Sequence, residues 1–223
     1  MVAKHRLLFS KTGRAKYLSH LDLMRTIQRV FARAGVAVRH TEGFNPHAYV
    51  SVALPLSVGV ESDCELMDFA LTDDTPLADL PALLTRNMPE GITVLAAYEA
   101  ETKLKDIAFL RVRGTLTYDT IVDTTDIAAK LTGFFAKESI PVKKLSKKKM
   151  ETTVDIRPMV REISFAPEDT NRVGVEAVIA AQNPGLNPNL LMEALRQHAA
   201  ELVPDFVVFS RVMVYNKDMQ VFR

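Results

Sequence analysis

The stretch SHLDLMRTIQRVFARAG, residues 19–35, indicates how the first half of the chain folds. Ser19 is a favourable helix N-cap, and Asp22 three residues later gives an acidic variant of the capping box that also suits the positive end of the helix dipole. Apolar side chains recur at helical spacing as far as Ala34, and Gly35 is placed to end the run. The pattern predicts an amphipathic helix over residues 20–34.

Strand-like segments lie on both sides of this helix. HRLLFS, residues 5–10, precedes the helix. Runs that are β-branched or alternate between apolar and polar residues follow it at residues 36–40, 48–54, 65–71 and 92–98. A second, shorter helix is predicted for residues 77–88, because prolines and a glycine delimit it. The order over about the first hundred residues is strand, helix, strand, strand, helix, strand.

The second half repeats this order without obvious sequence identity. Strands are predicted for residues 108–118, 172–181 and 206–215, with at least one more between 142 and 165, and helices for 121–137 and 190–202. We therefore predict an α+β protein of two tandem ferredoxin-like (βαββαβ) units. The domains are expected at residues 1–102 and 103–223, with the joint in the charged stretch 99–106.

Composition narrows the class of protein. The chain has 223 residues, of which 48% are hydrophobic, and a net charge of +1, so it is neither disordered nor strongly basic. Its one cysteine, Cys64, excludes an internal disulfide, a multi-cysteine zinc site and an iron–sulfur cluster held by its own thiolates. Because no segment approaches the ~20 apolar residues of a membrane span, we expect a cytoplasmic protein without membrane contact.

Charge is segregated along the chain. Residues 1–48 carry nine Lys or Arg against two acids, whereas residues 49–102 carry one Arg against ten acids. Arg25, Arg29 and Arg33 are spaced every four residues on the predicted helix, so they share a face that can either track phosphates or simply be solvated. KKLSKKKM, residues 143–150, is a second basic run, which is either a phosphate patch or a solubilising loop.

Two histidines occupy constrained positions. His20 lies in the first turn of the predicted helix, where the dipole favours a neutral imidazole, and His47 follows the turn GFNP, residues 43–46. We expect both to reach one polar pocket beside Asp22 and Arg25; the alternative is that each merely satisfies local backbone groups. No zinc, P-loop or dinucleotide motif is present in the sequence, so neither a metal site nor a cofactor is expected.

Four motifs carry a family resemblance, namely YLSHLDLMRTIQR (17–29), GFNPH (43–47), ALPLSVGVES (53–62) and the KKK run with VDIRP (147–149 and 154–158). On them the chain resembles the radical-SAM-linked domain family, proteins fused to, or encoded beside, cobalamin-type radical SAM proteins, and without an established activity. The resemblance covers nearly the whole chain and departs at Ala48, where the family tends to have proline. It implies a radical SAM protein as partner. One cysteine cannot hold that partner's kind of cluster, so the chain would be an accessory.

Three functional hypotheses remain open. The leading one is a non-catalytic module that binds RNA or an RNP substrate for the partner, and no catalytic residue is assigned. The alternatives are a metal-independent endoribonuclease using His20 or His47, and a protein-interaction module whose acidic segment, 49–102, binds a basic protein. The residues expected to bind are His20, Asp22, Arg25, Arg29, Arg33, Phe44, Asn45, His47, Lys143, Lys144, Lys147, Lys148, Lys149 and Arg157.

Overall fold

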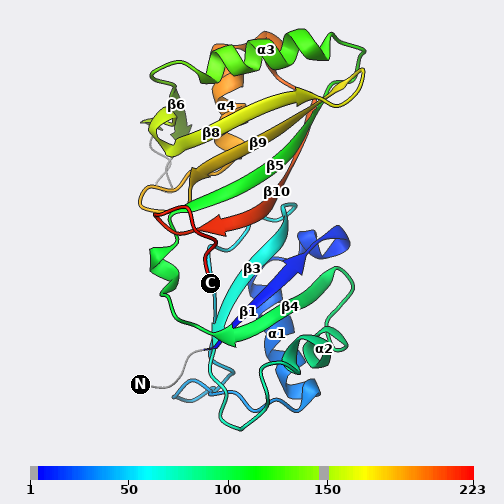
Figure 1. The fold of residues 1–223 in the computed structure, drawn as a ribbon, viewed down its shortest axis with the longest axis vertical. Helices are drawn as coiled ribbons and strands as arrows, with labels where there is room; N and C mark the ends of the chain where they lie inside the picture. Colours follow the sequence, from blue (N-terminus) through cyan, green and yellow to red (C-terminus); the bar gives the residue numbers. More distant parts are fainter. Residues whose placement is uncertain (1–4, 146–150) are drawn as a thin grey trace. The chain divides into compact units, whose positions relative to one another are not determined.

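The computed structural model describes residues 5–145 and 151–223 and divides into two compact units (Figure 1). Unit 1 runs to Asp106 and takes in Phe222–Arg223, whereas unit 2 comprises Ile107–Val221. The boundary predicted between residues 102 and 103 falls just before the observed one. Phe222 and Arg223, predicted with the second half, group with unit 1.

Unit 1 contains a four-stranded antiparallel sheet and two helices. Its elements are β1 (His5–Lys11), η1 (Gly13–Tyr17), α1 (His20–Ala34), β2 (Val50–Val52), β3 (Glu61–Phe69), α2 (Leu80–Thr85), β4 (Ile92–Glu99) and η2 (Leu104–Asp106), where η marks a 3-10 turn. The strands lie in the order β4-β1-β3-β2. The order of elements therefore matches the prediction for the first hundred residues.

Helix α1 has the predicted bounds and ends. The Ser19 hydroxyl oxygen accepts from the Asp22 backbone N–H at 3.2 Å and donates to the Asp22 carboxylate at 2.7 Å. Gly35 follows the helix with φ 69°, the left-handed conformation that suits glycine after a helix C-terminus. Helix α2 is shorter than predicted, and of the two strand-like runs after α1 only three residues form a strand.

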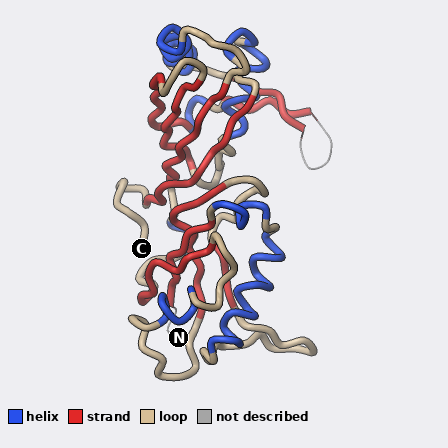
Figure 2. The backbone as a smooth tube through the Cα atoms, turned by 90° about the vertical axis from the view of Figure 1, so that its right-hand side faces the viewer, coloured by secondary structure: helices blue, strands red, loops and turns tan. Residues whose placement is uncertain are grey.

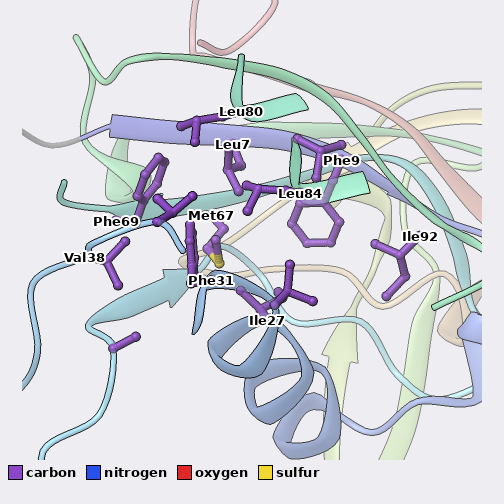
Figure 3. Close-up of a cluster of buried hydrophobic side chains, with 14 of the residues drawn as sticks. Leu7, Phe9, Ile27, Phe31, Val38, Met67, Phe69, Leu80, Leu84 and Ile92 are labelled. Carbon is purple, nitrogen blue, oxygen red and sulfur yellow. The ribbon is translucent and has the colours of Figure 1, made fainter. Parts of the chain in front are cut away.

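The core of unit 1 lies between its helices and one face of its sheet (Figure 3). Strands β1 and β3, helices α1 and α2 and strand β4 all contribute side chains that are 4% exposed or less: Leu7, Phe9, Ile27, Phe31, Met67, Phe69, Leu80, Leu84, Ile92 and Val94. Because side chains alternate along a strand, the residues between these core positions face the other side of the sheet.

Unit 2 has the same strand order with a ribbon inserted. Its elements are β5 (Phe109–Thr117), α3 (Thr124–Phe135), β6 (Pro141–Leu145), β7 (Glu151–Asp155), η3 (Arg157–Met159), β8 (Val160–Pro167), β9 (Arg172–Ala180), α4 (Asn189–His198), η4 (Ala200–Leu202) and β10 (Phe206–Tyr215). The main sheet has the order β10-β5-β9-β8. Strands β6 and β7 pair only with each other and stand away from the main sheet (Figure 2).

The α+β class is confirmed. If the inserted ribbon is set aside, each unit places its fourth strand beside its first, then its third, then its second. The assignment of the units to the ferredoxin-like fold stays a prediction. In the described part of the chain, no helix has the length and apolar content needed to span a bilayer.

A buried ion pair lies on the sheet face of unit 1 that points away from the core. Arg6 of β1 donates from Nε and Nη2 to the two carboxylate oxygens of Asp68 on β3, at 2.6 and 3.1 Å. Its remaining N–H groups reach Thr102, at 3.0 Å to the hydroxyl and 2.8 Å to the carbonyl. The guanidinium lies 4.9 Å from the ring centroid of Phe222, so the last residues of the chain complete this side of unit 1.

Removal of Asp68 should destabilise unit 1 strongly. Asp68→Ala leaves the Arg6 charge buried without its counterion, which costs about 3–5 kcal/mol. Asp63→Ala, at an exposed position of the same strand, should change stability by less than about 0.5 kcal/mol. Urea unfolding followed by circular dichroism measures both variants, and equal stability of the two would contradict the role assigned to the pair.

Candidate functional site

The first candidate surface is the loop between α1 and β2, residues 39–49, called here the aromatic loop. Two backbone hydrogen bonds join the outgoing and returning arms of the loop. The Thr41 N–H donates to the His47 carbonyl at 2.8 Å, and the Tyr49 N–H donates to the Arg39 carbonyl at 2.7 Å. Gly43 at the tip has φ 127°, a conformation in which other residues are strained. The loop is therefore an ordered hairpin-like projection.

His47 is fixed within this loop. Its Nδ1 lies 3.1 Å from the Asn45 carbonyl oxygen and 3.2 Å from the Thr41 hydroxyl. Because a carbonyl only accepts, Nδ1 carries the proton in this contact, which leaves Nε2 as the acceptor of the ring. Next to it, Phe44 is fully exposed. The structure thus brings Phe44, Asn45 and His47 together at one tip.

The arginine row on α1 is exposed but not uniform. Arg25 lies 3.7 Å from Asp22, and Arg33 donates to the Asn87 carbonyl at 2.6 Å. Arg29 makes no ion pair with any residue that the structure describes. On this face, Arg29 is therefore without an ion pair to a described residue, while Arg25 has a nearby acid and Arg33 a carbonyl acceptor.

His20 and the aromatic loop meet α1 at different places. His20 begins the helix, whereas the loop contacts it at Gln28, whose side chain donates to the Ala48 carbonyl at 3.3 Å. Eight residues of helix separate the two points by about 12 Å. Among the described contacts none joins His20 to His47, so the shared pocket stays a prediction without geometric support.

The second candidate surface is a groove in unit 2, called here the ribbon groove. It has a volume of about 760 Å³ and lies between the β6–β7 ribbon and the C-terminal end of α4. Mostly polar residues line it, but the surface that they turn toward the groove is mainly hydrocarbon. The lining residues, two exposed lysines among them, are Pro141, Lys143, Lys144, Glu151, Thr153, Gln197 and His198. Of the predicted lysines, Lys143 and Lys144 lie here, while Lys147, Lys148 and Lys149 are outside the described residues.

Side chains of α4 hold the ribbon in place. Gln197 accepts from the Lys143 N–H and donates to the Lys143 carbonyl, both at 2.9 Å, so its amide acts as a neighbouring strand would. His198 Nε2 donates to the Pro141 carbonyl at 2.6 Å, which leaves Nδ1 as an acceptor. These contacts involve the backbone of β6 and not its lysine side chains. Of the two lysines, only Lys143 pairs with a described acid, Glu151, at 3.5 Å.

The base of the ribbon is closed by Asp155. One of its carboxylate oxygens accepts from the Ile140 and Arg157 backbone N–H groups at 2.9 and 3.0 Å. These bonds, chiefly the one from Ile140, lower the pKa of Asp155. Arg157 also donates from its side chain to the Val160 carbonyl at 2.7 Å, so this predicted binding residue is part of the ribbon base.

Gln197 and His198 belong to the candidate site as anchors of the ribbon, a role that the sequence pattern did not indicate. Both sit in a predicted helix and read as ordinary polar positions, and the contact to β6 spans more than fifty residues of chain. The basic last turn of α4 is the only local signal. Within the described residues, no cluster of three or more His, Cys, Asp or Glu could hold a metal ion.

Loss of the Gln197 amide should loosen the ribbon. Gln197→Ala removes both bonds to Lys143, so amide hydrogen exchange at Lys143 should accelerate at least ~5-fold, while exchange in β9 stays unchanged. Arg196→Ala, at the exposed neighbouring position, is the control. Equal exchange at Lys143 in the two variants would show that the ribbon is held by other means.

Comparisons with known proteins give a family and a fold. The model of a family described as "Uncharacterized protein conserved in bacteria" (DUF2344) matches residues 4–190. A search of the curated proteins finds no match. A chain of the Cbf5–Nop10–Gar1 complex is 8% identical over 94% of this chain and 48% of its own length, with a TM-score of 0.50. A chain of the archaeal box H/ACA sRNP Nop10–Cbf5 complex is 11% identical over 93% and 46%, with a TM-score of 0.45. The present chain thus spans about half the length of each. The first match, at 8% identity, shows a similarity of fold alone.

Proposed function

Since the chain belongs to the DUF2344 family of uncharacterised bacterial proteins, we propose a function from its own surfaces: it is a cytoplasmic, non-catalytic module that binds single-stranded RNA. Its ribbon groove contacts the phosphates of the RNA. The partner is a radical SAM protein, to which this chain presents the RNA. The two units are ferredoxin-like, as the strand order of each supports.

The observation that carries this proposal is the lysine-bearing ribbon above an open groove. Lys143 and Lys144 are neighbours on β6, and both residues line the groove. The backbone of β6 is already satisfied by β7 and by Gln197. Lys144 makes no ion pair with a described residue, and Lys143 is paired only with the exposed Glu151, so both ammonium groups can reach an anionic chain. Three further lysines follow within residues 147–149 of the sequence.

The rest of the lining suits a nucleotide chain better than a single phosphate ion. Thr153 supplies a hydroxyl, Glu151 supplies acceptors, and His198 has Nδ1 as an acceptor. A hydroxyl donor and these acceptors can form hydrogen bonds with base edges and ribose hydroxyls, once lysines have neutralised the phosphates. A volume of about 760 Å³ accommodates more than one nucleotide-sized group.

The radical SAM partnership rests on the family resemblance and on one exclusion. A radical SAM enzyme holds its cluster with three cysteines, and this chain has only Cys64, which is buried. The chain can therefore contribute binding to such an enzyme but not the cluster. Binding of the substrate is the contribution that the ribbon groove supports.

Charge reversal on the ribbon tests the proposal. Lys143→Glu with Lys144→Glu should weaken binding of a fluorescent RNA of about 12 nucleotides by ~10-fold or more. The slope of log K against log salt should become shallower by about 1.4, because each lost contact with a single strand removes about 0.7. Fluorescence anisotropy between about 50 and 200 mM salt measures both quantities.

Lys130→Glu with Lys137→Glu is the matched control, since both lysines are exposed in unit 2 and the change in net charge is the same. It should bind RNA nearly as the unchanged protein does. Equal weakening by the two double variants would reduce the effect to overall charge, and absence of RNA binding by the unchanged protein would refute the function. Cleavage of the RNA in the presence of a chelator would favour the endoribonuclease alternative instead.

A further inference from the structure

Phe44 has no structural reason to be aromatic. It is fully exposed at the tip of the aromatic loop, between Gly43 and Asn45. Burial of a phenylalanine side chain contributes about 1.5–3 kcal/mol to stability, and at this position that contribution is absent. An exposed ring on an ordered projection is therefore available to a binding partner.

The loop presents the ring in a fixed place. One end is joined to the sheet by the Arg39 N–H, which donates to the Ala70 carbonyl at 2.8 Å just beyond β3. The other end is joined to α1 through Gln28 and Ala48. The bonds of His47 to Asn45 and Thr41 brace the tip from within. Because the loop is held at both ends, little conformational entropy remains to be lost when a partner binds.

The loop around Phe44 also carries a guanidinium, imidazoles and a second exposed aromatic ring. Arg39, His40 and His47 are exposed in the same loop, and Tyr49 is 44% exposed at its end. Glu42 lies 3.8 Å from Arg39, and because both side chains are exposed this ion pair is weak and can give way to a phosphate. Aromatic side chains beside a cationic one are typical of surfaces that bind single-stranded nucleic acids.

We propose that Phe44 stacks on an unpaired nucleobase of the bound RNA. The inference rests on the proposed function and deepens it, because it assigns base contact to unit 1 while the ribbon groove of unit 2 contacts phosphates. Arg39 then meets a phosphate beside the stacked base. His47 accepts from an exocyclic amine of the base through Nε2, which its Nδ1 contact to Asn45 leaves free.

The absence of tryptophan from the chain allows a direct test. Phe44→Trp places a single indole at the loop tip, where stacking on a base quenches its fluorescence. Titration uses an RNA of about 12 nucleotides and an abasic oligomer of equal length, which keeps the phosphates and lacks the bases. The RNA should quench the indole by roughly half or more, and the abasic oligomer should leave it nearly unchanged.

Phe44→Leu separates stacking from simple apolar contact. It should weaken RNA binding by about 10-fold, within the range for loss of one aromatic–base stack, and leave binding of the abasic oligomer unchanged. Phe206→Leu, at another exposed phenylalanine, should alter neither. The substituted side chain is exposed, so the melting temperature of the protein should stay the same.

The outcomes distinguish the two claims. If the unchanged protein binds RNA but Phe44→Leu binds it equally well and Phe44→Trp is not quenched, stacking is wrong while RNA binding by the ribbon stands. If Phe44→Leu weakens RNA and abasic binding to the same extent, the loop acts on phosphates and the inference is again wrong. If the unchanged protein binds no RNA, both claims fail. If, in that case, a partner protein binds the unchanged protein but not the Phe44→Leu variant, Phe44 instead docks into a pocket on that partner.

Discussion

The ion pair between Arg6 and Asp68 sets the register on which unit 1 depends. The two residues lie directly opposite each other on β1 and β3, and neither charge can be left alone in a buried position. A slip of one residue would separate them and turn Leu7 and Phe9 out of the core. With β3 held in this register, its other edge pairs with Val50–Val52 and, just beyond, with Val38. The place of the aromatic loop therefore follows from a charge pair inside the sheet.

In unit 2 the constraint is the exposed edge of a two-stranded ribbon. An isolated hairpin is only marginally stable in water, so β6 and β7 need a further partner. The side chains of Gln197 and His198 supply it by bonding to the backbone of β6, the Val142 side chain is buried, and Asp155 closes the base. Because these contacts need no lysine side chain, those of Lys143 and Lys144 stay exposed at the surface. The same arrangement that stabilises the ribbon thus provides its positive charge.

Local signals in the sequence predict the fold well where one element decides its own shape. Helix α1 is predicted to the residue, because its cap, its apolar period and Gly35 all agree. Helix α2 and the strand after α1 are shorter than predicted, since their ends are decided by contacts that the sequence does not display. Residues 143–150 read in the sequence as a basic run, either a phosphate patch or a solubilising loop. The contacts of Gln197 and His198 to β6 are not readable there, because they join distant segments. The position of His47 after the turn formed by residues 43–46 is readable from the sequence because the turn is local. The expected convergence of His20 and His47 depends on tertiary contacts, and it stays a prediction.

We propose that RNA contacts this protein at the ribbon groove and at the aromatic loop. The most direct measurement is photochemical crosslinking of the protein to an RNA that carries 4-thiouridine, followed by mass spectrometry of the crosslinked peptides. Crosslinks are expected in residues 39–49 and 141–155, and they should be lost when unlabelled RNA competes. Crosslinks concentrated in residues 50–102 of the acidic segment, or the absence of competed crosslinks, would contradict RNA binding at these two surfaces.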